Sequence, residues 1–271
     1  MAGYITCELN ERLGNNLFQI SHAYAQAIKH NRSFVIFDQG HEHLLNFYPN
    51  IFRKFDFLRG NIPNHYVSVE TPFSFKEVTP DLQDCVFKGW YQSEKFFKPY
   101  SNIIKDLYTP QPLFVDNMLM KYPMLKDSNV TAIHVRRGDY IKYPLYHPVF
   151  SSEYIRFAAS QIPTDWYFIF SDDIQWCKDN IFLKSQLIIE ESDWASLWIM
   201  SMCKNFIISN STFSWWGSYL SKNENKTIIA PRIWFGPGYN YHNVNDIYCD
   251  SWTIMPSEYC DGTIIPIYKE L

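Results

Sequence analysis

Apolar residues near the amino terminus recur with the spacing of a helix. Between residues 17 and 28 they lie three or four positions apart, at Leu17, Ile20, Ala23, Tyr24, Ala27 and Ile28. Short runs of strand-forming residues flank this helix at 4–7 and 33–37, and the segment 9–16 carries Gly14 among polar residues, which favours a turn. The pattern predicts a strand–loop–helix–strand unit whose loop follows the carboxyl end of the first strand.

The next part of the chain is less regular, with scattered prolines and aromatic residues. The pattern there indicates a strand at 85–88, helices at 93–107 and 112–120, and a linker at 121–128 that contains Pro123.

Beyond residue 128, strands and helices alternate. Continuous apolar runs predict strands at 130–135, 166–170, 187–189, 206–208 and 227–229, with helices at 152–161, 174–180, 194–203 and 211–221. Such strands separated by helices are typical of a parallel sheet covered on both faces. We therefore predict an α/β fold of two halves, residues 1–125 and residues 126–271, the second ending in a tail. Ligands of such folds bind beyond the carboxyl ends of the strands, so we expect the substrates in a cleft between the halves.

Composition and charge exclude several classes of protein. Hydrophobic residues make up 46% of the 271 residues and charged residues 19%, which excludes a disordered chain. The net charge is −4 without a basic stripe, so no nucleic-acid partner is expected. No run of 18 apolar residues exists, so no integral membrane segment is expected. Because the chain start also lacks the pattern of a signal peptide, we expect a cytoplasmic protein.

Polar residues concentrate where the predicted strands end. Arg136 and Arg137 follow one strand, and guanidinium groups bind phosphate in bidentate fashion. The segment 209–212 follows another strand at a helix start, where hydroxyl and backbone N–H groups suit a phosphate. Ser211 or Thr212 taken alone is equally typical of a helix N-cap. The coincidence with two arginines at another strand end favours the phosphate site.

Other residues at the strand ends have several interpretations. His134 closes a strand, and such a histidine is usually a structural hydrogen-bonding group. Asp172 and Asp173 have three possible roles: capping a helix, accepting hydrogen bonds from ligand hydroxyls, or binding a metal as a pair. No third carboxylate stands at ligand spacing, so no metal site is predicted.

Four segments resemble the α-1,2-fucosyltransferases, glycosyltransferase family 11. Residues 134–140 (HVRRGDY) look like the family motif H-x-R-R-x-D-Y, and residues 209–217 (SNSTFSWWG) resemble its second signature. Residues 230–235 (APRIWF) are similar to its A-P-x-x-W-F element, and residues 12–19 (RLGNNLFQ) to its G-x-L-G-N-Q-x-F-Q loop. The four segments follow one another in the family's order.

The resemblance implies a GT-B-like fold with two Rossmann-type halves. It also implies an inverting, metal-independent transfer of L-fucose from GDP-fucose to the 2-hydroxyl of a galactoside. GDP-fucose is then the donor substrate, the acceptor is a galactose-containing oligosaccharide, and no cofactor is expected. The N-terminal half is expected on the acceptor side and the C-terminal half is expected to bind the nucleotide sugar.

The resemblance further implies roles for single residues. Arg136 is expected to act on the pyrophosphate during catalysis, with Arg137 supporting the loop or the phosphate. The remaining expected donor-binding residues are His134 near the nucleoside, Asp172 on nucleoside hydroxyls or an arginine, Ser211, Thr212 and Phe213 along the phosphates, and Gly14 and Asn15 in the N-terminal loop.

An inverting transfer also needs a base for the acceptor hydroxyl. Asp139 is the first candidate because it shares a loop with Arg136, and an ion pair that fixes Arg136 or Arg137 is an equally good interpretation. Glu153 and His147 are weaker candidates.

Three departures from the family pattern bear on the donor. Arg12 replaces the usual first glycine and Asn16 the usual glutamine of the N-terminal loop. Ser196 stands where relatives carry an acidic residue for the guanine edge, and Asp193 or Glu191 is a candidate substitute. The alternative functions are therefore a transferase of the same fold with a different nucleotide sugar, and a non-catalytic carbohydrate-binding protein.

Aromatic residues make up 18% of the chain, and the core is expected to take most of them while some present flat rings to a ligand. Phe168, Phe170, Phe206, Trp215 and Trp216 belong to predicted strands and helices and are expected in the core. The rings of segments 41–57 and 87–100 are expected to face an acceptor sugar.

Overall fold

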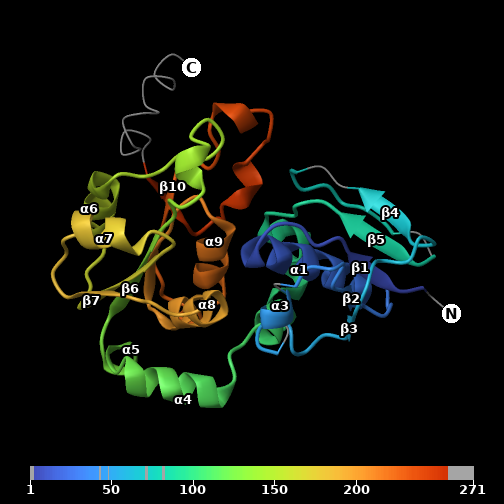
Figure 1. The fold of residues 1–271 in the computed structure, drawn as a ribbon, viewed down its shortest axis with the longest axis horizontal. Helices are drawn as coiled ribbons and strands as arrows, with labels where there is room; N and C mark the ends of the chain where they lie inside the picture. Colours follow the sequence, from blue (N-terminus) through green and yellow to red (C-terminus); the bar gives the residue numbers. More distant parts are fainter. Residues whose placement is uncertain (1–2, 43, 48, 71–72, 81–82, 256–271) are drawn as a thin grey trace. The chain divides into compact units, whose positions relative to one another are not determined.

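The computed structural model describes residues 3–42, 44–47, 49–70, 73–80 and 83–255 of the chain. The chain divides into two units (Figure 1). The first comprises Met1–Pro110 and His242–Cys249, and the second comprises Gln111–Tyr241 and Asp250–Leu271. The first unit therefore ends earlier than the expected position near residue 125, and it regains a short segment late in the chain.

The first unit is built on parallel strands. Its elements are β1 (Ile5–Cys7), α1 (Leu13–Lys29), β2 (Ile36–Phe37), α2 (Leu44–Phe47), β3 (Phe57–Leu58), β4 (Val67–Glu70), β5 (Cys85–Lys88), the 3-10 helices η1 (Glu94–Phe96) and η2 (Lys98–Tyr100), α3 (Ser101–Leu107) and the late 3-10 helix η5 (Asn245–Ile247). Three strands form a sheet in the order β1-β5-β4, and β2 pairs with β3. A bridge between Ile5 and Phe34 joins the two groups of strands.

Helix α1 begins four residues before the apolar periodicity does. The prediction that Gly14 lies in a turn is wrong, because Gly14 and Asn15 belong to the first turn of the helix. Asn16 and Gln19 are fully buried on α1, so they occupy inward positions that a count of apolar residues misses. The left-handed backbone falls instead at Glu11, with φ 66°.

The prediction of one helix over residues 93–107 is also wrong. The segment folds as η1 and η2, and only Ser101–Leu107 is α-helical. Pro99 has no backbone N–H and disfavours helical geometry at the residue before it, which limits the segment to short 3-10 turns.

Most of the described rings in segments 41–57 and 87–100 belong to the core and do not face a ligand. Most of them are buried in the first unit, namely Phe47, Phe52, Phe55, Phe87, Tyr91, Phe96 and Phe97. They surround the buried His22 and Tyr108: His22 stacks on Tyr91 at 4.1 Å between ring centroids, and Phe52 and Phe55 contact Tyr108. The expectation that these rings face an acceptor is therefore wrong for this set, and Tyr48 lies outside the described residues.

The second unit contains a six-stranded parallel sheet in the order β11-β10-β9-β6-β7-β8. The strands are β6 (Val130–Val135), β7 (Trp166–Ser171), β8 (Gln186–Ile188), β9 (Asn205–Ile207), β10 (Ile228–Pro231) and β11 (Thr253–Met255). The helices are α4 (Pro112–Lys121), α5 (Met124–Asp127), α6 (Ser152–Ser160), α7 (Ile174–Asn180), α8 (Asp193–Met202) and α9 (Thr212–Tyr219), with 3-10 turns η3 (Tyr140–Lys142) and η4 (Pro237–Tyr239). The predicted parallel sheet is confirmed.

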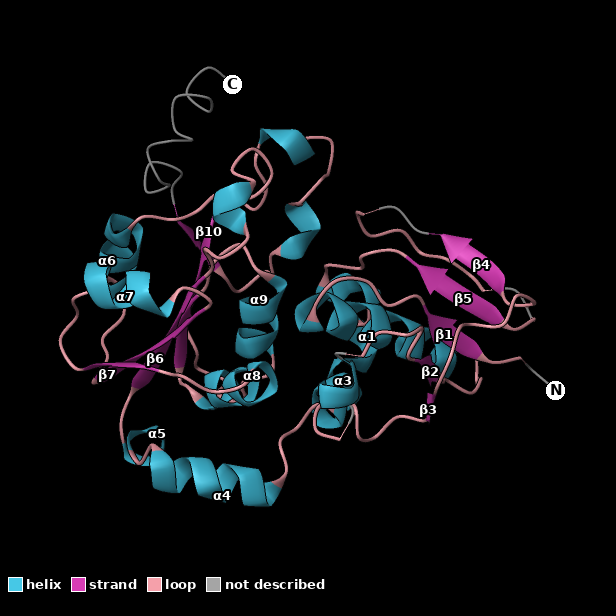
Figure 2. Ribbon diagram, viewed as in Figure 1, coloured by secondary structure: helices cyan, strands magenta, loops and turns pink. Residues whose placement is uncertain are grey.

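Helices cover both faces of this sheet. Figure 2 shows α6 and α7 on one side of the strands and α8 and α9 on the other. Ile133, Ile169 and Ile207 pack with residues of α6 and α7 in one buried cluster. The predicted core residues Phe168, Phe170, Phe206, Trp215 and Trp216 are all buried, which confirms their assignment. Within the described part of the chain, no helix is long and apolar enough to cross a membrane.

Candidate active site

Three neighbouring strands of the second unit bring the polar motifs together. Strand β6 pairs with β7 on one side and with β9 on the other, all in parallel. The segments that follow these strands therefore meet at one edge of the sheet. They carry residues 136–140, 172–173 and 208–212, as the strand-end pattern predicted.

The guanidinium of Arg136 lies between two carboxylates. Its Nη1 is 2.6 Å from Asp172 Oδ2, and its Nη2 pairs with Asp139 Oδ1. The group also lies over the ring of Tyr140, with Cζ 5.0 Å from the ring centroid. The Arg136 side chain is only 14% exposed, so these contacts fix where its charge points.

Asp172 organises the loop of the first motif. Its Oδ1 accepts a 2.9 Å hydrogen bond from the backbone N–H of Arg137, while its Oδ2 binds Arg136. A Cβ at position 138 would lie 2.4 Å from Asp172 Oδ2, so the close approach requires Gly138. Of the two interpretations that the resemblance left open for Asp172, the structure shows the contact with an arginine.

Arg137 is held away from Arg136 by a second carboxylate. Its Nε is 3.3 Å from Asp173 Oδ2, and its guanidinium lies over the Trp176 ring at 4.0 Å. Asp173 also caps helix α7, accepting a 3.1 Å hydrogen bond from the Trp176 backbone N–H. Asp172 and Asp173 thus each bind an arginine. Among the described residues, no three histidine, cysteine, aspartate or glutamate side chains gather in a metal-binding group.

His134 is neutral and connects two of the strand ends. Its Nδ1 lies 2.7 Å from Ser209 Oγ, which follows β9. Burial, with a smaller contribution from the charge of Arg136, lowers the pKa of His134 to about 3. The ring also lies 5.3 Å from that of Phe213. Because its pKa is so low, His134 adds no positive charge beside Arg136 at neutral pH.

The N-terminus of helix α9 has an unused cap. Ser211 occupies the N-cap position with extended backbone, but its side chain makes no capping hydrogen bond. Thr212 and Phe213 form the first turn. Asn210 fixes the preceding loop by donating to the carbonyl groups of Pro148 (3.2 Å) and Trp234 (3.0 Å). Because the backbone N–H groups of a first helical turn point outward, this end suits an anion.

Tyr140 joins the Arg136 loop to the loop before α9, a role that the sequence did not reveal. Its hydroxyl donates a 3.1 Å hydrogen bond to the carbonyl of Asn210, and its ring stacks on His147 at 4.3 Å. Burial raises the pKa of Tyr140 to about 12, so the hydroxyl stays protonated. The tyrosine that ends the H-x-R-R-x-D-Y motif was the available signal. His147 is part of this ring stack, and burial lowers its pKa.

The residues considered for a guanine contact occupy the start of α8. Ser196 is buried and donates to the backbone carbonyl of Glu191 at 3.3 Å. Glu191 accepts a 2.8 Å hydrogen bond from the Tyr122 hydroxyl and pairs with Lys121, so its carboxylate is engaged. Asp193 lies exposed in the first turn of α8.

The other sequence candidates lie elsewhere. Gly14 and Asn15 belong to the first unit, where the Gln92 side chain donates a 3.0 Å hydrogen bond to Asn15 Oδ1. Glu153 lies on α6, largely exposed and paired with Arg156. The geometry thus brings together Arg136, Asp139, Asp172, His134 and the α9 N-terminus, and it leaves Glu153 outside this group.

Comparison with known proteins agrees with the motifs. Residues 80–256 match the model of the family described as glycosyl transferase family 11. The chain belongs to glycosyl transferase family 11. Within that fucosyltransferase family, it is 26% identical to an Escherichia coli α-1,2-colitosyltransferase, over 85% of this chain and 92% of that protein. It is 32% identical to the E. coli O-antigen biosynthesis glycosyltransferase WbnK, over 62% of this chain and 59% of that protein.

Solved structures show the same fold at low sequence identity. The NodZ α-1,6-fucosyltransferase of Bradyrhizobium, soaked with GDP-fucose, aligns with a TM-score of 0.52 at 13% identity, over 81% of this chain and 93% of that one. A mutant of Arabidopsis thaliana FUT1 in complex with GDP gives 0.53 at 11% identity, over 96% of this chain and 74% of that one. These likenesses confirm the predicted GT-B-like α/β fold.

Proposed function

We propose that this glycosyltransferase moves L-fucose from GDP-fucose to the 2-hydroxyl of a galactoside, with inversion and without a metal. The observation that carries the proposal is the position of the Arg136 guanidinium, which two carboxylates hold over the Tyr140 ring, while the Tyr140 hydroxyl binds the loop that leads into the uncapped N-terminus of α9. Two independent groups that favour anions thus lie at one edge of the sheet, as a diphosphate requires.

The two carboxylates on Arg136 are not equivalent. Asp172 is also bound by the Arg137 backbone N–H and its side chain is 26% exposed, whereas the Asp139 side chain is 41% exposed. We infer that a donor diphosphate displaces Asp139 and leaves Asp172 in place. The more exposed Asp139 carboxylate is better hydrated after it leaves Arg136, so breaking its ion pair costs less free energy. Asp139 then becomes available beside the reacting sugar.

The proposed reaction is a single displacement. The bond between the sugar anomeric carbon and the β-phosphate oxygen breaks, and the galactoside 2-oxygen forms the new bond from the opposite face. The electron pair of the broken bond passes to the diphosphate, whose growing charge Arg136 and the α9 N–H groups stabilise. Asp139 is the proposed acceptor of the proton from the 2-hydroxyl.

One assay tests the whole proposal. The purified chain is incubated with GDP-fucose and a set of β-galactosides in the presence of excess chelator, and GDP release is measured. Proton NMR of the product identifies the anomeric configuration and the linked position. The proposal predicts an α-linked fucose on O2 that forms in chelator; turnover that depends on galactoside but yields another linkage contradicts it.

A second donor deserves direct comparison because a relative that spans most of this chain is named a colitosyltransferase. The second candidate function is therefore colitosyl transfer from the corresponding nucleotide sugar at the same site. Fucose differs from colitose by the 3-hydroxyl, so kcat/KM for the two GDP-linked sugars, measured with one acceptor, decides between the candidates.

A further inference from the structure

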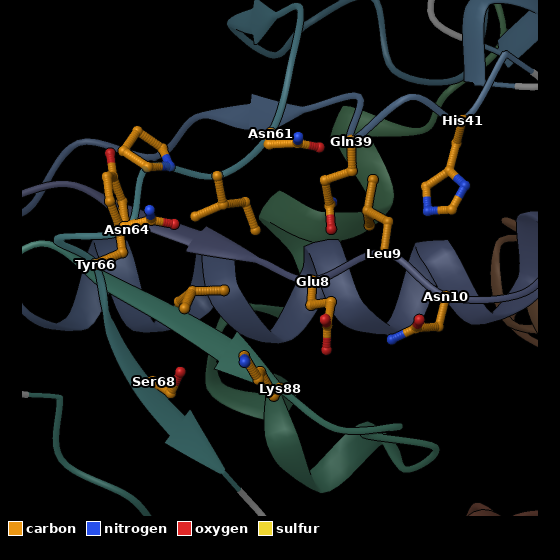
Figure 3. A pocket seen from close by; sticks show the side chains of 13 residues that line it. Glu8, Leu9, Asn10, Gln39, His41, Asn61, Asn64, Tyr66, Ser68 and Lys88 are labelled. Carbon is orange, nitrogen blue, oxygen red and sulfur yellow. The ribbon is translucent and has the colours of Figure 1, made fainter.

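The first unit contains a pocket of about 470 Å³ whose lining includes none of the residues that gather around Arg136. Figure 3 shows it on the β1–β5–β4 sheet, over the strand face that bears Ser68 and Lys88. It is lined by Glu8, Leu9, Asn10, Gln39, His41, Asn61, Ile62, Pro63, Asn64, Tyr66, Ser68, Val86 and Lys88, all from the first unit.

Parallel register explains why these side chains share one face. Ser68 lies opposite Val86 in the β4–β5 pair, and Val86 lies opposite Thr6 in the β1–β5 pair. Side chains two positions apart on a strand point to the same side, which places Glu8 with Thr6 and Lys88 with Val86. Leu9 and Val86 are buried and supply apolar surface, while the remaining lining is mostly polar.

The backbone that carries Gln39 and Asn61 is fixed by one carboxylate. Asp38 Oδ1 accepts hydrogen bonds from the N–H groups of Gly60 (2.8 Å) and Gly40 (3.2 Å), and these bonds, that of Gly60 first, lower the pKa of Asp38. The Gln39 N–H also donates to the Gly60 carbonyl at 3.0 Å. These hydrogen bonds join the loops after β2 and β3 into one rim.

The opposite rim is fixed by the N-terminal motif. The Asn10 N–H donates to Gln19 Oε1 at 3.1 Å, and Asn16 Nδ2 donates to the Asn10 carbonyl at 3.1 Å. Gln19 also donates to the carbonyl of Gly89, beyond the end of β5. Two buried side chains of α1 thus hold the segment that presents Glu8 and Asn10 to the pocket.

The lining chemistry fits a neutral, hydroxyl-rich ligand. Side-chain amides of Asn10, Gln39, Asn61 and Asn64 both donate and accept hydrogen bonds, which matches the alternating needs of sugar hydroxyl groups. Glu8 and Lys88 contribute opposite charges to the lining, which gives no net preference for an anion or a cation, and the amide-rich lining disfavours an apolar ligand. The Tyr66 ring adds a flat surface of the kind that sugar faces contact.

We propose that this pocket binds one neutral saccharide unit of the acceptor glycan. The choice of galactosides as probes rests on the proposed function, whereas the site itself rests on the pocket. Hydrogen bonds hold both rims together without a ligand, and a site formed in this way limits the entropy lost on binding.

Two variants test the site while leaving its framework in place. Asn61→Leu removes an exposed amide from the rim, and Ser68→Val replaces a strand hydroxyl with a strand-favouring side chain. Asn102→Leu, at an exposed asparagine of α3 outside the pocket, is the matched control. Lactose, N-acetyllactosamine and methyl β-galactoside serve as probes, with binding followed by saturation-transfer NMR and by titration without donor.

We expect each pocket variant to weaken binding of the best probe at least about tenfold, the loss that follows when a polar ligand group is left unpaired. The acceptor KM should rise by a similar factor, and Asn102→Leu should match the wild-type chain. Equal binding by the pocket variants and the wild type overturns the proposal, as does a wild-type chain that binds none of the probes.

The outcomes separate this inference from the proposed function. If the wild-type chain transfers fucose normally and the pocket variants have an unchanged acceptor KM, the pocket proposal is contradicted and the proposed reaction is supported. If the wild-type chain does not turn over GDP-fucose but binds a saccharide that both pocket variants fail to bind, the proposed reaction is contradicted and the pocket proposal is supported. Thermal unfolding of each variant verifies that the first unit is folded.

Discussion

Arg136 illustrates how one side chain is prepared for a highly charged ligand. Two carboxylates and a tyrosine ring hold its guanidinium in one orientation before any diphosphate is present. A guanidinium held in this way loses little further entropy on binding, and its planar donors match two phosphate oxygens. The function of Arg136 therefore depends on the orientation of its guanidinium as well as on its charge.

Replacing Arg136 separates these two contributions. Arg136→Ala should lower kcat by about 100-fold or more, roughly 2.7 kcal/mol of transition-state stabilisation, as for other groups that face a developing charge. Arg136→Lys should recover little of this loss, because an ammonium keeps the charge but not the bidentate geometry. Steady-state kinetics with GDP-fucose measure both variants, and a lysine variant close to wild type contradicts the assigned role.

Asp139 and Asp172 should respond differently to the same change. Asp139→Asn should keep GDP affinity near wild type while kcat collapses and the acidic limb of the pH–rate profile disappears, because the proposed base is lost. Asp172→Asn should mainly weaken GDP binding, because it loosens both Arg136 and the Arg137 backbone. Calorimetric GDP titration and pH-dependent kinetics separate them; two variants with the same profile argue that Asp139 only fixes Arg136.

The site residues were predictable from sequence to different degrees. Arg136, Asp139 and Asp172 follow directly from strand ends and motif spacing, and the structure places them together. The partners that hold them were not visible: nothing in the sequence pairs Tyr140 with the Asn210 carbonyl, 70 positions away. Such contacts depend on which strands are neighbours, which a linear pattern does not contain.

At the scale of single elements, the N-terminus of helix α9 has two interpretations, a helix N-cap and a ligand site. Its N-cap serine makes no capping bond, whereas Ser151, the N-cap of α6, accepts from the Tyr154 N–H at 3.3 Å. The two serines occupy the same position in helices of similar length. They are therefore a natural pair for distinguishing a cap from a ligand site.

Alanine at each N-cap tests this distinction. Ser151→Ala should lower the free energy of unfolding by about 1 kcal/mol, the usual value of a helix cap, without changing GDP affinity. Ser211→Ala should cost less stability than this, because no capping bond is lost, but should weaken GDP binding about tenfold through the loss of a hydrogen bond to a charged phosphate. Denaturant unfolding and GDP titration of both variants measure the contrast. A full capping loss at Ser211 with unchanged GDP affinity would restore the simple N-cap interpretation.

Element prediction succeeded where apolar periodicity follows the fold. Helix α7 spans Ile174–Asn180 as predicted, and the central strands β6 and β9 agree to within one residue. It failed at the start of α1, where buried Asn16 and Gln19 look like loop residues, and at β3, which has only two residues. It also failed at β4, whose sequence VSVE has no continuous apolar run. A buried polar side chain with a partner satisfies the core as well as an apolar one, but only the structure reveals the partner.

For the whole molecule, the sequence predicts α/β alternation and a parallel sheet, but not the connectivity between the units. Residues 242–249 return to the first unit after the second unit's sheet is nearly complete. Asp246 of this segment pairs with Lys95 and accepts a 3.0 Å hydrogen bond from the Phe75 N–H. These two polar contacts tie the returning segment to residues of the first unit, and no local preference signals them.

Burial keeps a core histidine neutral in each unit, His22 in the first and His134 in the second, and this makes a prediction for the whole chain. Burial lowers the pKa of His22 in the first unit and of His134 in the second to about 3, against 6.5 for an unburied histidine. The folded state therefore disfavours protonation, and the stability contributed by the neutral forms is complete above pH 6.5 and declines as the pH falls toward 3. At pH 5 the loss should be about 2 kcal/mol for each histidine.

Differential scanning calorimetry between pH 7 and pH 5 measures this loss in both units. His22→Leu should flatten the pH dependence of the first unit's unfolding and leave that of the second unit unchanged, because the variant removes a buried histidine from the first unit alone. The wild-type chain, scanned over the same pH range, is the control. If His22→Leu keeps the full acid sensitivity, the destabilising protons bind elsewhere, and the neutral core histidine of the first unit is not its source.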